Sequence, residues 1–178
     1  MANLAAMVLF TFSSPVAADG DVRLRHAEAF IDAFYSFEPT RLQPYLAQAP
    51  QAHAKIMYYQ GWARGGEYKV VDRQPCQHEA DLIICRVTVA DNLIKALQIN
   101  MHVTDVFSIT MDKMVITKVE TSSNDPEAFA IASEWLITQQ PQIMQTVCKG
   151  LMNGGPTPAQ CARAFVAGFK AYIQTTSE

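Results

Sequence analysis

The spacing of apolar residues changes twice along this 178-residue chain, and the order of the changes restricts the possible folds. From Asp21 to Gly66 apolar residues recur every three or four positions, which predicts helices. From Glu67 to Ser123 they tend to alternate with polar residues, which predicts strands. The helical spacing returns after Asn124. Helices, then a run of strands, then helices is the order of an α+β domain and not of a parallel sheet with alternating helices.

Three helices are expected before the strands. The first ends near Phe37, because Pro39 disfavours a helical conformation of the residue before it. A short second helix is expected with Thr40 as its cap. A third follows Pro50 and stops at Gly65-Gly66.

Four strands are expected in the segments 67–76, 81–91, 93–110 and 114–123, which form an antiparallel meander with short turns. The third is long enough to be bent or bulged. Counting by twos from Leu93 places Asp105 on its apolar face, between Val103 and Phe107. An unpaired carboxylate is costly to bury, and its pKa would rise. Asp105 is therefore the first candidate site residue.

Helices resume after the strands and form a C-terminal extension over residues 123–178. Asp125 is the expected cap of the first of them, with Pro126 in its first turn. The segment Thr157–Gln160 has the pattern of a capping box for the last helix. We expect this helical hairpin to pack on the same domain as the strands.

The four cysteines predict two local disulfides. Cys76 and Cys85 are equidistant from a turn at Ala80-Asp81, so a hairpin sets them opposite each other at a distance that suits a disulfide. Cys148 and Cys161 flank the loop between two helical segments. Four cysteines allow three pairings, and this is the local one. Zinc binding is the alternative, but the chain lacks both C-x-x-C and a histidine pair at helical spacing.

Residues 1–18 have the layout of a secretory signal peptide. An uncharged apolar run from Leu4 to Phe12 is followed by small residues, with Val16 and Ala18 suited to cleavage after Ala18. No Lys or Arg precedes the run, which departs from the usual pattern. A membrane anchor, for which the run is too short, and a buried first helix are the alternatives. Export to a secreted or periplasmic location is the expectation.

Charge and motifs limit the classes of partner and cofactor. The net charge is −3, and the 14 Lys and Arg residues are scattered, which does not favour nucleic acids or anionic membranes. The chain has no glycine-rich phosphate loop, nucleophile elbow or metal-ligand spacing. We therefore expect no cofactor, no metal and no membrane span in the mature chain.

The segment "VTDVFSITMDKMVITKVE", with its acid, aromatic residue, short turn and return strand, resembles the nuclear transport factor 2-like superfamily. This superfamily includes the SnoaL-like cyclases and ketosteroid isomerase. The resemblance covers Arg23 to Ser122, within an expected domain of residues 19–122. It implies a cone-shaped, curved antiparallel sheet packed against the N-terminal helices, with a pocket at the open end. It also implies a possible homodimer through the outer sheet face.

Under this resemblance Asp105 matches the strand acid that ketosteroid isomerase keeps protonated to stabilise an oxyanion. SnoaL-like cyclases also place a proton-transfer acid on the sheet. Phe30 stands where the isomerase has its donor tyrosine, and the segment Gln48–Trp62 contains neither Asp nor Glu. Because the catalytic base is missing, steroid isomerisation is not expected. His102 lies on the opposite strand face from Asp105 and is not expected to act with it.

Three functions remain open for such a pocket. The leading hypothesis is the binding of a small apolar or amphipathic molecule, with Asp105 as its main polar contact. The second is an isomerase, cyclase or dehydratase with Asp105 as general acid and a hydroxyl from Tyr35, Tyr58 or Tyr59. The third is a non-catalytic dimerisation or accessory module whose interior is filled by its own side chains. Asp105 is then a structural acid, satisfied by a tyrosine hydroxyl or a backbone N–H.

The residues expected to line the pocket are aromatic and come from the helices and the long strand. They are Phe30, Phe34, Tyr35, Tyr59, Trp62 and Phe107.

Overall fold

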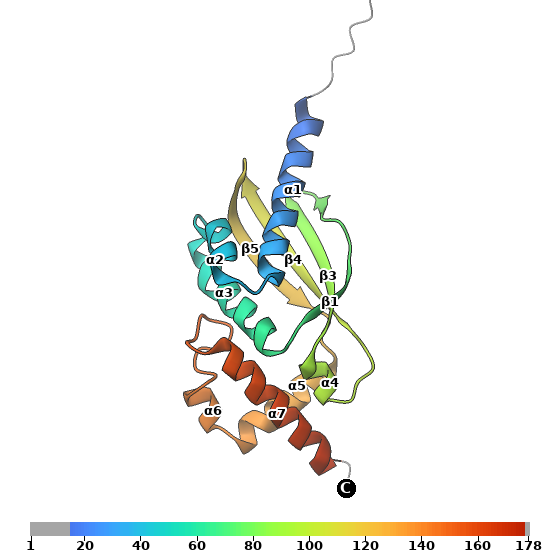
Figure 1. The fold of residues 1–178 in the computed structure, drawn as a ribbon, viewed down its shortest axis with the longest axis vertical. Coiled ribbons are helices and arrows are strands. Elements are labelled where there is room, and N and C mark those ends of the chain that lie inside the picture. Colours follow the sequence, from blue (N-terminus) through green and yellow to red (C-terminus); the bar gives the residue numbers. More distant parts are fainter. Residues whose placement is uncertain (1–14, 177–178) are drawn as a thin grey trace, which may run out of the picture.

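An antiparallel sheet of five strands is the centre of the computed structural model, which describes residues 15–176 (Figure 1). The strands are β1 (Lys69–Arg73), β2 (Gln77–Glu79), β3 (Leu82–Ala90), β4 (Val103–Asp112) and β5 (Val115–Ser123). The helices before and within the sheet are α1 (Pro15–Tyr35), α2 (Pro39–Leu42), the 3₁₀ helix η1 (Gln43–Leu46), α3 (Pro50–Gly65) and α4 (Asn92–Ala96). The helices after it are α5 (Glu127–Gln139), α6 (Gln142–Gln145) and α7 (Pro158–Thr176). The α+β class is confirmed. The predicted signal peptide, residues 1–18, lies mostly outside the described residues.

The strands form a meander in the order β1-β3-β4-β5, and β2 pairs with the other half of β3. All pairs are antiparallel, as predicted. Asp105 on β4 lies opposite Val87 on β3 and Ser123 on β5. The register of β4 and β5 shifts between Thr110 and Met111, which is the bulge expected of a long strand.

The two faces of β4 differ as the alternating pattern predicts. Its odd-numbered residues are buried: Val103, Asp105, Phe107, Ile109 and Met111. The even-numbered residues between them are partly exposed. Helix α1 lies across the buried face, where the rings of Phe30 and Phe107 are 6.1 Å apart (Figure 1). Burial of this apolar face is the main stabilising term available to the sheet.

The first part of the predicted third strand is wrong, because residues 92–96 form helix α4. The Asp91 carboxylate accepts hydrogen bonds from the backbone N–H groups of Leu93 (2.7 Å) and Ile94 (2.9 Å), so it caps this helix. Gln98, with a φ of 58°, stands in the left-handed region after the helix. The apolar residues of α4 then pack against α7.

Three helix ends lie within two residues of their predicted positions. The predicted end of the first helix is Phe37, and α1 ends at Tyr35. The predicted cap of the second is Thr40, and the N-cap of α2 is Glu38. The predicted cap of the first helix after the strands is Asp125, and the N-cap of α5 is Pro126. Phe37 has a φ of 57°, which is incompatible with a continuing helix. Asp125 does not cap α5. Its carboxylate accepts a hydrogen bond from the Ser123 hydroxyl.

Both local disulfides are present. The Cα atoms of Cys76 and Cys85 are 4.3 Å apart across the β2–β3 hairpin, and those of Cys148 and Cys161 are 4.7 Å apart. Disulfides of this kind are typical of proteins from oxidising compartments. Within residues 15–176, no helix combines the length and the hydrophobicity needed to cross a bilayer.

The C-terminal helices gather beyond one end of the sheet, where α7 packs against α3 (Figure 1). Glycines make this approach possible. A Cβ atom on Gly65 would lie 2.6 Å from the Cα of Ala159, and one on Gly61 would lie 3.0 Å from the Cβ of Pro158. Both distances are too short for ordinary contacts, so α3 presents bare backbone to the start of α7.

We predict that Gly65→Ala destabilises the protein by about 1–3 kcal/mol, because the new methyl group meets backbone atoms of Ala159 that cannot move aside. In an unobstructed helix, a change from glycine to alanine stabilises by about 1 kcal/mol. The expected loss of stability at Gly65 is therefore opposite in sign to the effect of helix propensity. Urea unfolding measures the change. Arg64→Ala, at an exposed position of the same turn, is the control and should change stability by less than about 0.5 kcal/mol. A more stable Gly65→Ala protein would contradict the close α3–α7 contact.

Candidate functional site

Asp105 is a buried acid held by two tyrosines. Its side chain is 1% exposed. The Tyr35 hydroxyl donates to Oδ2 at 2.6 Å, and the Tyr59 hydroxyl donates to Oδ1 at 2.5 Å. The three residues belong to β4, α1 and α3, so the hydrogen bonds join the sheet to both main helices.

Local sequence explains how the three residues meet. The period of two in β4 turns Asp105 inward, and Tyr35 is the last residue of α1, where the helix passes over that strand. Phe107 lies two positions further along the same strand face. Its ring centroid is 6.2 Å from that of Tyr35 and 6.3 Å from that of Tyr59. These ring contacts orient both phenols toward the carboxylate.

Burial raises the pKa of the Asp105 carboxyl to about 6, although the hydrogen bonds from Tyr35 and Tyr59 oppose the shift. The pKa of each tyrosine is raised, first by burial and then by the negative charge of Asp105. At neutral pH the cluster is therefore one carboxylate and two neutral phenols. In the described part of the chain, no Lys, Arg or His side chain forms an ion pair with Asp105.

This geometry limits what Asp105 can do chemically. Asp105 is 1% exposed and each of its oxygens accepts a hydrogen bond from a tyrosine, so a substrate reaches the carboxylate only if the side chains that cover it move aside. The arrangement matches the structural interpretation, in which tyrosine hydroxyls satisfy the acid. Tyr59 belongs both to this cluster and to a cavity, because its ring forms part of the cavity wall.

The cavity has a volume of about 380 Å³ and lies between α3, β5, α5, α7 and the loop around Leu151. Its apolar and aromatic wall consists of Tyr59, Trp62, Tyr68, Phe129, Ile137, Leu151, Met152 and Phe165. Its polar residues are Lys55, Thr121, Ser122, Ser123, Asp125 and Ser133. Ligand pockets of proteins commonly have this size and this mixture of apolar walls with few polar groups.

The structure divides the six predicted pocket residues into two groups. Tyr59 and Trp62 line the cavity. Phe30, Phe34, Tyr35 and Phe107 are outside its wall and pack against one another, with the rings of Phe34 and Phe107 4.9 Å apart. Close packing explains this division, because inward side chains of α1 and β4 meet directly and fill the space between them.

Sequence reasoning did not identify the part of the wall that comes from Tyr68 and the C-terminal helices. Phe129 and Phe165 lie in segments that the sequence predicts to be helices, and each is one of several apolar residues there. An apolar stripe does not indicate whether its residues meet other side chains or face a gap. Tyr68, two residues after Gly66, carried no signal beyond its aromatic character.

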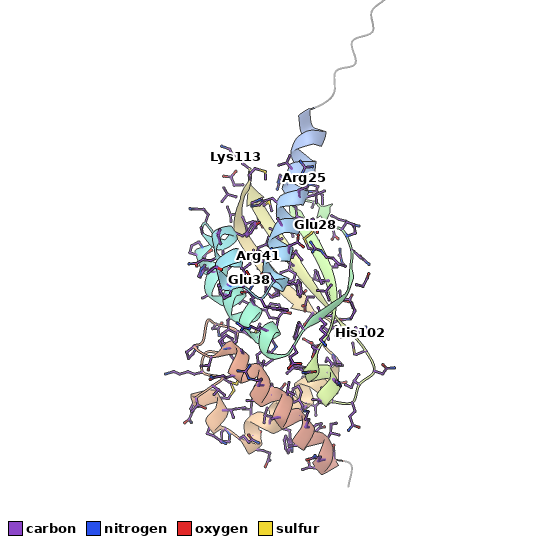
Figure 2. All side chains as sticks on the ribbon, in the orientation of Figure 1. Arg25, Glu28, Glu38, Arg41, His102 and Lys113 are labelled. Carbon is purple, nitrogen blue, oxygen red and sulfur yellow. A yellow bond between two sulfur atoms is a disulfide. The ribbon has the colours of Figure 1, made fainter. Side chains whose placement is uncertain are left out.

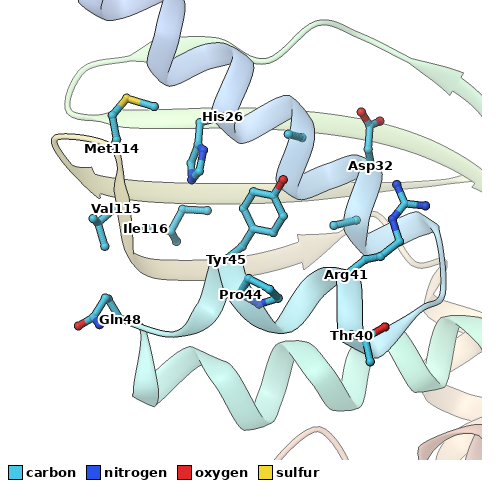
Figure 3. A pocket seen from close by; sticks show the side chains of 12 residues that line it. His26, Asp32, Thr40, Arg41, Pro44, Tyr45, Gln48, Met114, Val115 and Ile116 are labelled. Atoms are coloured by element: carbon cyan, nitrogen blue, oxygen red, sulfur yellow. The ribbon is translucent and has the colours of Figure 1, made fainter.

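Other candidate groups lie elsewhere. A larger, open hollow of about 680 Å³ runs between α1, η1 and the β4–β5 turn, and Figure 3 shows His26 and Tyr45 among its lining residues. Asp32, also in its wall, forms an ion pair with Arg73. His102 is exposed before β4, at the edge of the molecule (Figure 2).

Among residues 15–176, no three His, Cys, Asp or Glu side chains are grouped so that they can hold a metal ion.

No protein-family model, no curated protein and no solved structure matches this chain.

We predict that Tyr59→Phe and Tyr35→Phe each lower the free energy of unfolding by about 1.5–3 kcal/mol at pH 7.5, because each removes a hydrogen bond to a charged group. Tyr58→Phe is the matched control. Tyr58 is buried on the same helix as Tyr59, but its hydroxyl has no hydrogen-bond partner among the described residues. Its removal should leave stability unchanged or raise it. Equal losses for Tyr58→Phe and Tyr59→Phe in urea unfolding would contradict the assigned role of Asp105.

We also predict a pH dependence that Asp105→Asn removes. The folded-state pKa of about 6 exceeds the unfolded value of about 3.9, so the folded state binds the proton more tightly. Below about pH 4 the acid is protonated in both states. As pH rises from about 4 to about 6, stability falls by about 3 kcal/mol, and it is constant above that range.

The measurement is urea unfolding of both proteins from pH 4 to 8. Subtracting the Asp105→Asn curve from the native curve cancels the titration of other groups. A difference that does not change with pH would show that the Asp105 pKa is the same in the folded and unfolded states.

Proposed function

We propose that this chain is an exported, disulfide-bonded domain of the nuclear transport factor 2-like, SnoaL-like class that binds a small apolar or amphipathic molecule. The observation that carries the proposal is the 380 Å³ cavity, whose wall is mainly apolar and aromatic. Burial of a ligand against such a wall is favourable in proportion to the apolar area removed from water.

The class assignment rests on the arrangement of elements and on one acid. N-terminal helices pack over one face of an antiparallel meander, and an inward acid stands on a central strand. In this proposal the sheet and helices form the cone that the resemblance implies. The cavity adjoins the end of the sheet where the C-terminal helices pack. Those helices, within residues 127–176, then close the open end of the cone.

The two disulfides support export to a secreted or periplasmic location, since such bonds persist in oxidising surroundings. The signal peptide at residues 1–18 is the segment proposed to direct that export.

A non-catalytic accessory module is the second candidate, and one observation favours it. The side chains of Phe30, Phe34 and Phe107 are fully buried and fill the space between α1 and β4. The enzyme hypothesis has less support, because general acid catalysis requires a free proton-transfer group near the substrate. Asp105 is not part of the cavity wall, and its carboxylate is buried beneath the two tyrosines that donate to it.

Filling the cavity tests the binding function. We predict that Ser133→Phe, which places a ring in the cavity from α5, weakens the binding of Nile red, a neutral apolar dye, at least tenfold. Thr138→Phe adds the same ring at an exposed position of the same helix outside the cavity wall, and should leave binding unchanged. Fluorescence titration gives the affinities, and native mass spectrometry of protein purified from its own source identifies a copurified molecule. An empty native protein that also fails to bind the dye would favour the accessory module instead.

A further inference from the structure

Five aromatic side chains line the cavity and come from separate parts of the fold. They are Tyr59 and Trp62 of α3, Tyr68 before β1, Phe129 of α5 and Phe165 of α7. Four of them are at least nine-tenths buried, and Phe129 is half-buried. The rings of Trp62 and Phe165 are 5.2 Å apart at an angle of 71°, so two ring planes form a corner. Aromatic faces carry partial negative charge and attract cations.

Carboxylates reinforce this negative character. Asp125 is part of the cavity wall, and Asp105 lies directly behind Tyr59, hydrogen-bonded to its hydroxyl. Asp91 caps helix α4 on the side of Tyr68. Burial raises the pKa of the Tyr68 phenol, and the negative charges of Asp105, Asp91 and Asp125 raise it further. The wall at Tyr68 is therefore in the field of three acids.

Lys55 is the one cationic side chain in the cavity wall, among the residues that the structure describes. It is exposed and has a long flexible stem, so water solvates its ammonium group. Asp125 is exposed as well, so water screens its charge and that of Lys55 alike, and the buried carboxylates of Asp105 and Asp91 give the cavity its excess of negative charge. A cation in the cavity would gain from this imbalance, and an anion would be opposed by it.

Three hydroxyls of the cavity wall already donate hydrogen bonds to groups of the protein. Tyr59 donates to Asp105, Ser133 donates to the carbonyl of Phe129, and Ser123 donates to Asp125. A primary ammonium needs several acceptors for its three N–H groups, and the rings of Trp62, Phe129 and Phe165 provide none. A quaternary ammonium needs none, because aromatic faces and nearby carboxylates stabilise it without hydrogen bonds.

We propose that the cavity selects an organic cation, namely a quaternary ammonium group attached to a short apolar body. This rests on the proposed binding function and adds the chemical class of the ligand. The ammonium group lies against the aromatic corner formed by Trp62 and Phe165, on the side of the carboxylates, and the apolar body contacts Leu151 and Met152. A volume of about 380 Å³ equals about a dozen water molecules, which accommodates such a ligand.

Isothermal titration calorimetry with three matched ligands tests this selectivity. Butyrylcholine is the cation, 3,3-dimethylbutyl butyrate is its uncharged carbon isostere, and octanoate is an anion of similar length. We expect butyrylcholine to bind at least tenfold more tightly than the isostere, and octanoate to bind weakest. Equal affinity for the cation and the isostere, or preference for octanoate, would overturn the cation inference. Either result would leave the proposed binding function intact.

Two variants identify the source of the selectivity. Asp125→Asn should weaken butyrylcholine binding severalfold and leave the isostere unchanged, whereas Glu127→Gln, an exposed acid outside the cavity wall, should change neither. Phe165→Leu keeps an apolar wall but removes one ring of the aromatic corner, and should reduce the ratio of the two affinities about fivefold. If both variants keep the native ratio, the cation inference fails. If none of the three ligands binds while Nile red does, the cation inference also fails. Only the loss of Nile red binding as well contradicts the proposed function.

Discussion

The hydrogen bonds from two tyrosines to the Asp105 carboxylate fix how the helices meet the sheet. An ionised acid that is 1% exposed is costly unless donors compensate for the lost water. The donors come from the end of α1 and the middle of α3, and both must reach one point on β4. A shift of either helix by one turn, about 5.4 Å, would leave a carboxylate oxygen without a partner. The position of α3 in turn determines where its Tyr59 and Trp62 rings stand.

The sequence predicts features of the fold that depend on neighbouring residues, but it does not predict helix α4, which depends on residues far along the chain. Alternation in β4 predicted an inward Asp105, and the spacing of Cys76 and Cys85 around a turn predicted their disulfide. The segment 92–101 was misassigned because its apolar residues fit a strand or a short helix equally well. The capping by Asp91 and the packing of α4 against α7 decide the outcome, and the second of these depends on residues far along the chain.

The site was only partly predictable for a similar reason. The sequence predicts which side chains turn inward, and Phe30, Phe34 and Phe107 do so. It does not predict which inward side chains meet each other and which face a gap, because that depends on distances between elements that are remote in sequence. Most of the cavity wall comes from the segment 123–178, which the sequence predicts to be an extension of the domain. Only Tyr59 and Trp62 belong to both the predicted and the observed walls.

The cavity stays open because helices α3 and α7 cannot move closer together and because the Tyr59 side chain is held in place. Gly65 already brings α3 against the backbone of Ala159, and Gly61 brings it against the ring of Pro158, so α3 and α7 cannot approach further at that end. Beyond this contact, Trp62 and Phe165 meet edge to face and hold the helices apart. The Tyr59 ring lines the remaining space, and its hydroxyl donates to Asp105. A rotation that moved its ring into the cavity would break that hydrogen bond and leave the buried carboxylate with one donor. The interaction that orders the helices on the sheet thus also keeps the cavity open.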